Sequence, residues 1–197
     1  MKIGLYFGTF NPIHVGHMII ANHMAEFSGL DQIWMVVTPH NPLKTKATLL
    51  DDYQRLYLVI LATEDYPKIK PSDVEFQLPQ PNYTVNTLAH LQEKYPTYEF
   101  SLIMGDDNLQ SLQKWKNYEV ILEHYDIYVY PRIAPNSESP TVKKAPDFGR
   151  KVHYIDAPTV EISSTFIRDC IKNKKNVHAL LPEKVWLDID RNNYYKK

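Results

Sequence analysis

The ten residues from Gly8 to His17, GTFNPIHVGH, constrain the fold of this chain more than any other stretch. They follow a short apolar run at residues 3–7, which is typical of a buried strand. They lead into residues 18–27, whose apolar side chains recur with helical spacing. A strand, a tight turn and a helix start in this order direct backbone N–H groups and the positive end of a helix dipole at one point. Such a point suits a phosphate group.

His14 and His17 add a second signal within the same stretch. They lie three residues apart, so their rings are expected side by side on the first helical turn. Two imidazoles next to backbone amides can hold the charge that develops on a polyphosphate. Each feature alone has a structural alternative, a tight connection for the glycine turn and a surface position for the histidines. Their combination directly after the first strand favours a phosphate site.

The length of 197 residues suits one domain with its own hydrophobic core, so a single domain over residues 1–197 is expected. The chain has 22 Lys and Arg residues and 23 Asp and Glu residues, so it has no excess of basic charge. Nucleic acid is therefore not expected as a substrate. Cys170 is the only cysteine, is interpreted as structural, and fits a reducing compartment. Neither a signal peptide nor an apolar run of ~18 residues is found, which predicts a cytoplasmic protein without membrane contact. A homo-oligomer is compatible with the sequence.

Strand and helix patterns alternate along the chain. Strands are expected at residues 32–37, 74–78, 99–104, 126–130 and 151–155. Helices are expected at residues 49–64, from 84 or 86 to about 95, 108–124 in two pieces around Trp115, 165–174 and 182–191, with a surface loop at 131–150. This alternation predicts an α/β fold, a doubly wound and mostly parallel sheet with helices on both faces. Ligands bind such a sheet beyond the carboxyl ends of its strands, where Gly8, Pro39, Gly105, Pro131 and Ile162 are expected to share one crevice.

Residues 162–168, ISSTFIR, form a second candidate anion site. Three hydroxyl residues at a helix start and Arg168 one turn later combine N–H groups, hydroxyls and a guanidinium. The alternative is an ordinary capping motif with a solvent-facing arginine. Two such helix starts, one near each end of the chain, would suit a triphosphate that bridges both halves of the sheet.

A third candidate lies at Gly105-Asp106-Asp107, directly after an expected strand. A carboxylate there can accept hydrogen bonds from a ribose hydroxyl or a base edge, and its alternative is to cap the following helix. A zinc site is not expected, because His14 and His17 lack a third ligand at zinc spacing. The sequence contains neither a Gly-x-Ser-x-Gly nor a Walker lysine motif.

These segments together resemble the nucleotidyltransferase superfamily, whose members transfer a nucleotidyl group from a nucleoside triphosphate. Residues 8–17 resemble its GTFDPxHxGH signature, residues 162–168 its ISSTxIR motif, and Asp107 falls on the acid of its GxD pattern. Asn11 replaces the aspartate of the signature, which keeps a side chain able to cap a turn but removes a charge. The fold implied by the resemblance is a Rossmann-like nucleotidyltransferase fold.

Other segments resemble bacterial nicotinate-mononucleotide adenylyltransferases. Residues 81–88, PNYTVNTL, are similar to their SYTxDTL segment, with Asn86 in place of an aspartate. Trp115 matches the tryptophan that stacks on the pyridine ring, with core packing as its alternative. Lys44 resembles the lysine after a proline-rich loop, although Leu43 stands where that family has histidine.

The resemblance implies transfer of an adenylyl group from ATP to nicotinate mononucleotide, giving deamido-NAD and pyrophosphate in NAD biosynthesis. It implies catalytic roles for His14, His17 and Arg168, acceptor contacts for Lys44, Thr84 and Trp115, and Mg²⁺ that arrives with ATP. Metal ligands within the chain are not implied. The residues implied to contact ATP are Gly8, Thr9, Phe10, Gly16, Gly105, Asp107, Arg132, Ile162, Ser163, Ser164 and Thr165.

Two alternatives stay open. The acceptor could be pantetheine phosphate or another phosphorylated compound, as in sister enzymes of the superfamily. A nucleotide-binding module without catalysis is the other, with Asn11 and Asn86 as signs of lost activity; the retained histidines and Arg168 argue against it. Arg55 and Arg132 are further cations that could face ATP, and a solvated surface position is expected for Arg55.

Overall fold

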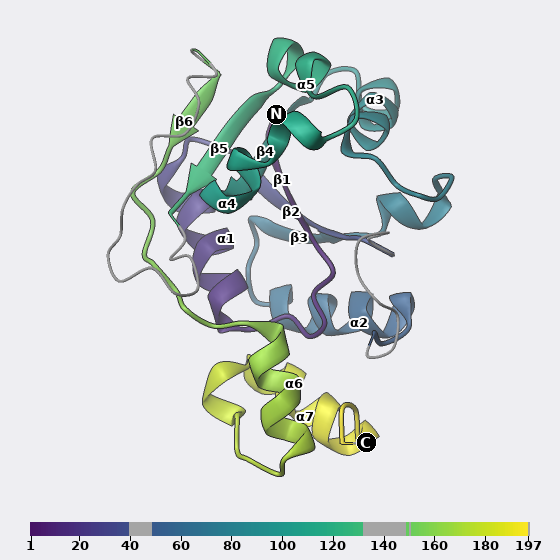
Figure 1. The fold of residues 1–197 in the computed structure, drawn as a ribbon, viewed down its shortest axis with the longest axis vertical. Helices are drawn as coiled ribbons and strands as arrows, with labels where there is room; N and C mark the ends of the chain where they lie inside the picture. Colours follow the sequence, from purple (N-terminus) through teal and green to yellow (C-terminus); the bar gives the residue numbers. More distant parts are fainter. Residues whose placement is uncertain (40–48, 132–148, 150, 197) are drawn as a thin grey trace.

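The computed structural model describes residues 1–39, 49–131, 149 and 151–196. Its centre is a six-stranded sheet in the order β3-β2-β1-β4-β5-β6, and every neighbouring pair is parallel (Figure 1). The strands are β1 (Lys2–Gly8), β2 (Gln32–Val37), β3 (Ile69–Ser72), β4 (Glu99–Gly105), β5 (Asp126–Tyr130) and β6 (Val152–Tyr154). This strand order is that of the doubly wound nucleotide-binding fold, so the predicted fold class is confirmed.

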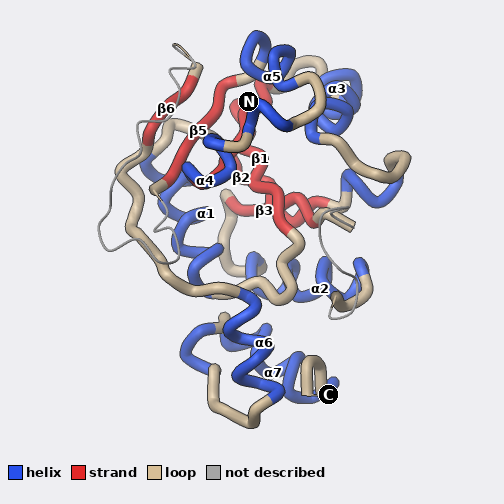
Figure 2. Tube along the Cα trace, in the orientation of Figure 1, coloured by secondary structure: helices blue, strands red, loops and turns tan. Residues whose placement is uncertain are grey.

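Helices cover both faces of the sheet, as predicted (Figure 2). One hydrophobic layer contains residues of α1 (Val15–Phe27), α2 (Asp52–Thr63), α6 (Ser164–Lys172) and α7 (Glu183–Asn192). The other layer contains residues of α3 (Thr84–Lys94), α4 (Asp106–Gln110) and α5 (Tyr118–His124). The short 3-10 helices are η2 (Val74–Gln77), η3 (Leu112–Lys114) and η4 (His178–Leu180).

Strand β1 illustrates why the strands read as continuous apolar runs. Ile3 and Leu5 pack in the layer with α3, α4 and α5, whereas Tyr6 joins the opposite layer. A strand covered on both faces needs apolar side chains at every position, which is characteristic of buried parallel sheets. Gly4 lies at a point of close approach, where a Cβ would come within 2.6 Å of the Leu30 side chain.

The expected strand at residues 74–78 is wrong. The edge strand β3 lies earlier, at Ile69–Ser72, and Val74–Gln77 forms the 3-10 helix η2. In an alternating strand, Glu75 would lie on the solvent-exposed face. In the structure its side chain is buried and accepts a hydrogen bond from Thr87 Oγ1 at 2.8 Å. Helix α2 also begins later than expected, because the Asp51 side chain accepts from the Tyr53 N–H at 3.0 Å and caps the helix there.

Most other elements agree with expectation to within a few residues, including the break at Trp115 between η3 and α5. The expected loop at 131–150 lies almost entirely outside the described residues. In the part of the chain that the structure describes, none of the helices is long and apolar enough to cross a membrane.

Candidate active site

The strand order places the point at which nucleotides bind in such folds between β1 and β4. Strands β1 and β4 are neighbours, with Tyr6 paired to Ile103 near their carboxyl ends. The chain leaves Gly8 toward α1 on one face and Gly105 toward α4 on the other, so the connections diverge. This is the topological switch point of a doubly wound sheet, and a crevice opens where the connections part.

The residues after β1 are held in one conformation by the ring of Phe10. Phe10 is 1% exposed and has a φ of 44°, and a Cβ at Gly8 would come within 2.7 Å of its ring. The ring packs edge-on against His17, with the two centroids 5.1 Å apart. The Phe10 side chain therefore supports the His17 ring from within the core.

His14 and His17 lie side by side, as their spacing predicts. Their rings stack with centroids 3.7 Å apart, and His14 is the N-cap residue of α1. The His14 N–H donates to His17 Nδ1 at 3.2 Å. Because Nδ1 accepts this bond, a neutral His17 ring carries its proton on Nε2, and that nitrogen is a hydrogen-bond donor.

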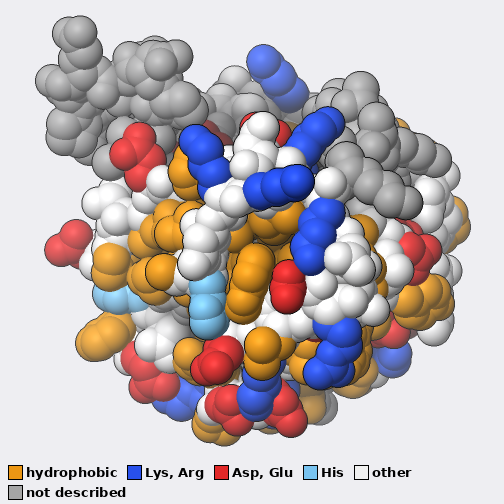
Figure 3. Space-filling model, turned by 90° about the horizontal axis from the view of Figure 1, so that it is seen from below, with side chains coloured by type: hydrophobic (Ala, Val, Ile, Leu, Met, Phe, Trp, Pro, Cys, Tyr) orange, Lys and Arg blue, Asp and Glu red, His pale blue; other side chains and the backbone are white. Residues whose placement is uncertain are grey.

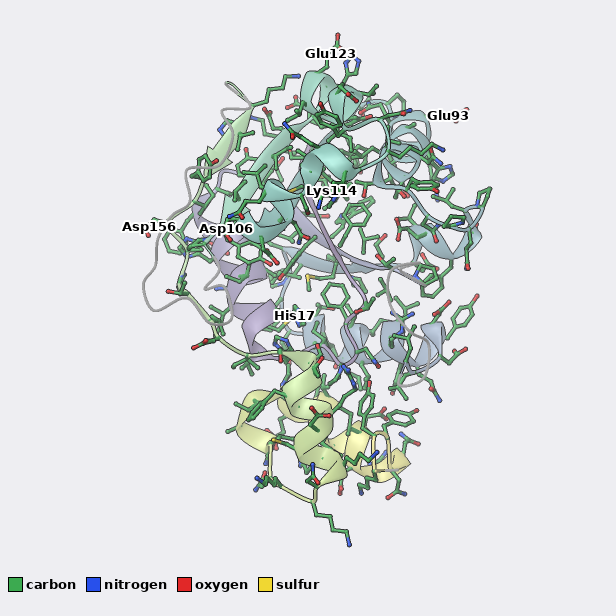
Figure 4. All side chains as sticks on the ribbon, in the orientation of Figure 1. His17, Glu93, Asp106, Lys114, Glu123 and Asp156 are labelled. Atoms are coloured by element: carbon green, nitrogen blue, oxygen red, sulfur yellow. The ribbon has the colours of Figure 1, made fainter. Side chains whose placement is uncertain are left out.

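The start of α6 docks on the same loop, which brings the two predicted anion sites together. Ser164 Oγ donates to the Pro12 carbonyl at 2.9 Å, and Arg168 Nη1 donates to the Asn11 carbonyl at 2.8 Å. Arg168 Nη2 lies 3.3 Å from Thr165 Oγ1, which orients the guanidinium. Figure 4 shows His17 beside the first turn of α6. Arg168 is thus tied to the loop that precedes the histidines, and the convergence of these three side chains on one ATP remains a prediction.

The hydroxyl groups of this segment also have structural partners. Ser163 is the N-cap of α6, and its Oγ accepts from the Phe166 N–H at 3.2 Å. Ile162 is half-buried against the layer that holds α1. Gly16, in the first turn of α1, is closely surrounded, because a Cβ would lie 3.0 Å from the Val160 side chain and would require that side chain to shift. The capping alternative is therefore correct for Ser163, and it leaves the N–H groups of the α6 start directed along the helix axis.

The environment of Arg55 differs from the one that the sequence predicts. The expected solvated position is wrong, since Arg55 is 0% exposed and pairs with Asp52. Its guanidinium donates to the carbonyl groups of Thr9 at 2.5 Å, Thr38 at 2.9 Å, Pro39 at 2.8 Å and Leu50 at 3.1 Å. One buried cation thus ties the loops after β1 and β2 to α2, a role without any local sequence signal.

On the other side of the crevice, Gly105 is the N-cap of α4, and Asp106 and Asp107 occupy its first turn. The alternative that Asp107 caps this helix is therefore wrong. Figure 4 shows Asp106 at the start of α4. Negative charge in the first turn of a helix interacts favourably with the helix dipole.

Two of the three predicted acceptor residues, Thr84 and Trp115, lie in segments that contact each other. Thr84 opens α3 with Tyr83 as N-cap, and Trp115 ends η3. Lys116 Nζ lies 4.4 Å from the centroid of the Tyr83 ring, which joins the two segments directly. Trp115 is half-buried and packs against the adjacent hydrophobic layer, so it combines a core contact with an accessible part.

Glu75 contacts Thr87 of α3, and the sequence analysis did not identify it as a buried residue. It is 2% exposed, its Oε1 accepts from Thr87 Oγ1, and its carbonyl accepts from Asn82 Nδ2 at 3.1 Å. Burial raises the pKa of this carboxyl group, while hydrogen bonds from Thr87 and Thr38 partly offset the effect.

Lys44 and Arg132 lie outside the described residues, so the structure does not place them.

A cavity of about 430 Å³ lies away from the crevice, near the amino ends of β4 and β5, where Glu99 and Asp126 line it. Among the described residues, no group of three or more His, Cys, Asp and Glu side chains is arranged to hold a metal ion.

Comparison with known proteins gives consistent matches. The Cytidylyltransferase-like family model matches residues 5–170. A Flavobacterium psychrophilum protein named "Probable nicotinate-nucleotide adenylyltransferase" is 72% identical over 100% of both chains. A Christiangramia forsetii protein of the same name is 62% identical over 99% of this chain and 98% of its own. The solved structure of Plasmodium falciparum nicotinic acid mononucleotide adenylyltransferase complexed with NaAD has a TM-score of 0.78, at 20% identity, over 99% of this chain and 97% of its own.

Proposed function

Because the chain belongs to the cytidylyltransferase-like family and, within it, to the nicotinate-nucleotide adenylyltransferases, we propose that the crevice between β1 and β4 is where it acts. The protein is a nucleotidyltransferase that transfers an adenylyl group from ATP to nicotinate mononucleotide in NAD biosynthesis. The named relatives favour neither of the open alternatives, a pantetheine-phosphate acceptor or a module that only binds nucleotides.

The observation that carries the assignment of the site is the meeting of His14, His17 and Arg168 around one loop. Arg168 donates to the Asn11 carbonyl at 2.8 Å, only three positions before His14. A cation and two imidazoles at one helix start provide donors for several phosphate groups of a single bound ATP.

In the proposed reaction an oxygen of the acceptor's 5′-phosphate attacks the α-phosphorus of ATP in line. The new oxygen–phosphorus bond forms as the bond to the bridging oxygen of the β-phosphate breaks, and pyrophosphate leaves with that electron pair. The attacking oxygen is already anionic, so the chain needs no general base. Catalysis then consists of positioning and of stabilising negative charge as it spreads over the phosphates.

The chain's own groups divide this work according to their positions. His17 Nε2–H and the neighbouring His14 ring donate to the α- and β-phosphates. Arg168 and the N–H groups at the α6 start neutralise the departing pyrophosphate. Asp107 accepts from the ATP ribose or base, while Thr84 and Trp115 hold the pyridine nucleotide.

Mg²⁺ is proposed to arrive with ATP and to supply additional positive charge on its phosphates. An ion that keeps its waters and takes phosphate oxygens as ligands does not require a carboxylate cage in the protein. We also propose that the reaction takes place in the cytoplasm, in keeping with the single, unpaired Cys170.

Substitution of His17 tests the proposal. His17→Ala is expected to lower kcat on the order of 10²–10³-fold with little change in KM, because one donor to the developing charge is lost. His17→Asn should lose a similar factor, although its amide oxygen can still accept the His14 N–H and preserve the helix cap. Pyrophosphate release with Mg-ATP and nicotinate mononucleotide is the measurement. His23→Ala, on the same helix, is the matched control and should keep wild-type turnover.

A change in turnover of only a few-fold in both His17 variants, with weaker ATP binding, would contradict the charge-stabilising role. Competition between nicotinate and nicotinamide mononucleotides in the same assay then determines the acceptor preference.

A further inference from the structure

The last residues of the chain fold back beneath the loop that holds the histidines. After α7 the chain reverses direction through Asn193, with a φ of 56°, and Tyr195, with a φ of 62°. The turn is closed by the Tyr194 N–H, which donates to the Ile189 carbonyl at 3.1 Å, and by Lys196, which pairs with Asp190 at 2.9 Å. Figure 3 views the molecule from this end, where basic and acidic side chains share the surface with hydrophobic ones.

The backbone of Tyr195 is held in an unfavourable region. A left-handed φ is common for glycine and asparagine but rare for an aromatic residue, and it persists only where the surroundings favour it. Here the reversal directs the Tyr195 side chain toward the start of the chain. Its hydroxyl donates to Asn11 Oδ1 at 2.7 Å, across 184 residues of sequence.

Asn11 is the connection between this hydroxyl and the histidines. It is 4% exposed, and its Oδ1 also accepts from the Leu50 N–H at 3.2 Å. Its backbone carbonyl accepts from Arg168, and Ser164 holds the next carbonyl, that of Pro12. The side chain and the main chain of Asn11 are thus fixed from three later segments, three residues before His14.

The Tyr195 hydroxyl group stays protonated and can therefore act as a hydrogen-bond donor. Burial raises the pKa of its hydroxyl, although the nearby guanidinium groups of Arg168 and Arg55 partly offset the effect. The hydroxyl therefore keeps its proton, and the proton has a defined acceptor in Asn11 Oδ1. Without that bond Asn11 would keep Leu50 as the donor to the same oxygen, at the longer distance of 3.2 Å.

We propose that Tyr195 is a positioning residue of the adenylyl transfer, whose hydroxyl fixes Asn11 and thereby the orientation of His14 and His17. This inference rests on the catalytic role proposed above for the histidines. It assigns to the C-terminal residues a function in the reaction, beyond filling the hydrophobic layer to which the Tyr195 ring also belongs. Packing alone would be served equally well by phenylalanine, so the hydroxyl distinguishes the two roles.

Tyr195→Phe is the direct test, because it removes one oxygen atom and leaves the ring. We expect kcat to fall about tenfold while KM for ATP and for nicotinate mononucleotide stays within twofold, since the loss acts on the orientation of groups that matter most in the transition state. The matched control is Tyr194→Phe, which removes the hydroxyl of the neighbouring tyrosine and should keep wild-type kcat.

A double-mutant cycle with Asn11 separates positioning from a general loss of folded protein. If the hydroxyl acts through Asn11, Asn11→Ala combined with Tyr195→Phe should lower kcat no further than Asn11→Ala alone. The ring ¹H–¹⁵N signals of His14 and His17 should shift in Tyr195→Phe but not in Tyr194→Phe. Thermal unfolding of each variant confirms that it is folded at the assay temperature.

The proposal is overturned if kcat of Tyr195→Phe stays within twofold of wild type. It is equally overturned if the losses from Asn11→Ala and Tyr195→Phe multiply, or if the histidine ring signals do not move. Failure of the proposed function looks different, because the wild-type protein itself would then release no pyrophosphate, whereas the effect of Tyr195 on the histidine signals could still be observed.

Discussion

Glu75 shows how one buried residue affects the whole fold. Its carboxyl group is 2% exposed, and burial raises its pKa above the ordinary value. The unfolded chain ionises this group at about pH 4.3, whereas the folded protein resists ionisation until higher pH. Folding is therefore favoured when Glu75 is protonated, and this contribution is lost as the pH rises from about 4.3 through the folded pKa.

Glu75→Gln should remove this pH dependence, because glutamine keeps the shape and the acceptor for Thr87 but does not ionise. The free energy of unfolding of the variant, relative to wild type, is expected to rise between about pH 4.3 and the folded pKa and then level off. Urea unfolding at a series of pH values measures it. Glu93→Gln, at an exposed position on α3, is the control. Parallel curves for Glu75→Gln and wild type would show that Glu75 ionises equally easily in both states.

Residues such as Glu75 and Arg55 mark the limit of what the sequence can predict. Each reads locally as a surface charge, and only its distant partners explain its burial. Arg55 is bound by carbonyl groups of Thr9, Thr38 and Pro39, which reach it from the ends of two other strands. Nothing in the helical pattern around position 55 contains that information, because the acceptors are backbone groups that any residue type supplies.

At the scale of elements, prediction was accurate where the signal is local. The strand, turn and helix start around residues 8–17 depend on small residues and a cap within one stretch, and the α6 start depends on Ser163 in the same way. The strand prediction for residues 74–78 is wrong because apolar alternation cannot distinguish an exposed strand from a 3-10 turn that buries one polar residue. The pairing of the Thr84 and Trp115 segments depends on tertiary packing and was implied only by resemblance.

The meeting of α3 and η3 leads to a prediction for Trp115. Lys116 contacts the Tyr83 ring, which places Trp115 next to the start of α3. Trp115→Ala should raise KM for nicotinate mononucleotide on the order of tenfold and leave KM for ATP within twofold, since a flat ring that stacks on the pyridine is lost. Trp115→Phe retains a stacking surface and should recover most of the loss. Steady-state kinetics with each substrate varied in turn provide the measurement, and equal effects on both KM values would assign this side chain to the core alone.

At the scale of the molecule, segments from the two ends of the sequence contact each other. Helices α6 and α7 come last in the sequence (Figure 1). Nevertheless, α6 docks on the loop after β1 through Ser164, and the Tyr195 hydroxyl donates to Asn11. The sheet alone positions only the β1 and β4 sides of the crevice. Arg168 comes late in the sequence, so the proposed set of phosphate donors is complete only once the C-terminal part has packed against the N-terminal loop. A ligand that touches both parts should therefore stabilise their association.

Binding of Mg-ATP without acceptor is expected to raise Tm by an amount that depends on its free concentration relative to its Kd. At about 100 times its Kd, a ligand adds about 2.7 kcal/mol, which for a domain of this size corresponds to about 5–10 °C. Arg168→Gln should lower the Tm of the free protein, because the bond to the Asn11 carbonyl is lost, and should also reduce the shift caused by a fixed ATP concentration to less than half. The shift, rather than Tm itself, reports the contact with ATP. Lys172→Gln, at an exposed position on α6, should leave the shift unchanged. An unaltered shift in Arg168→Gln would mean that ATP binds to the N-terminal loop without Arg168.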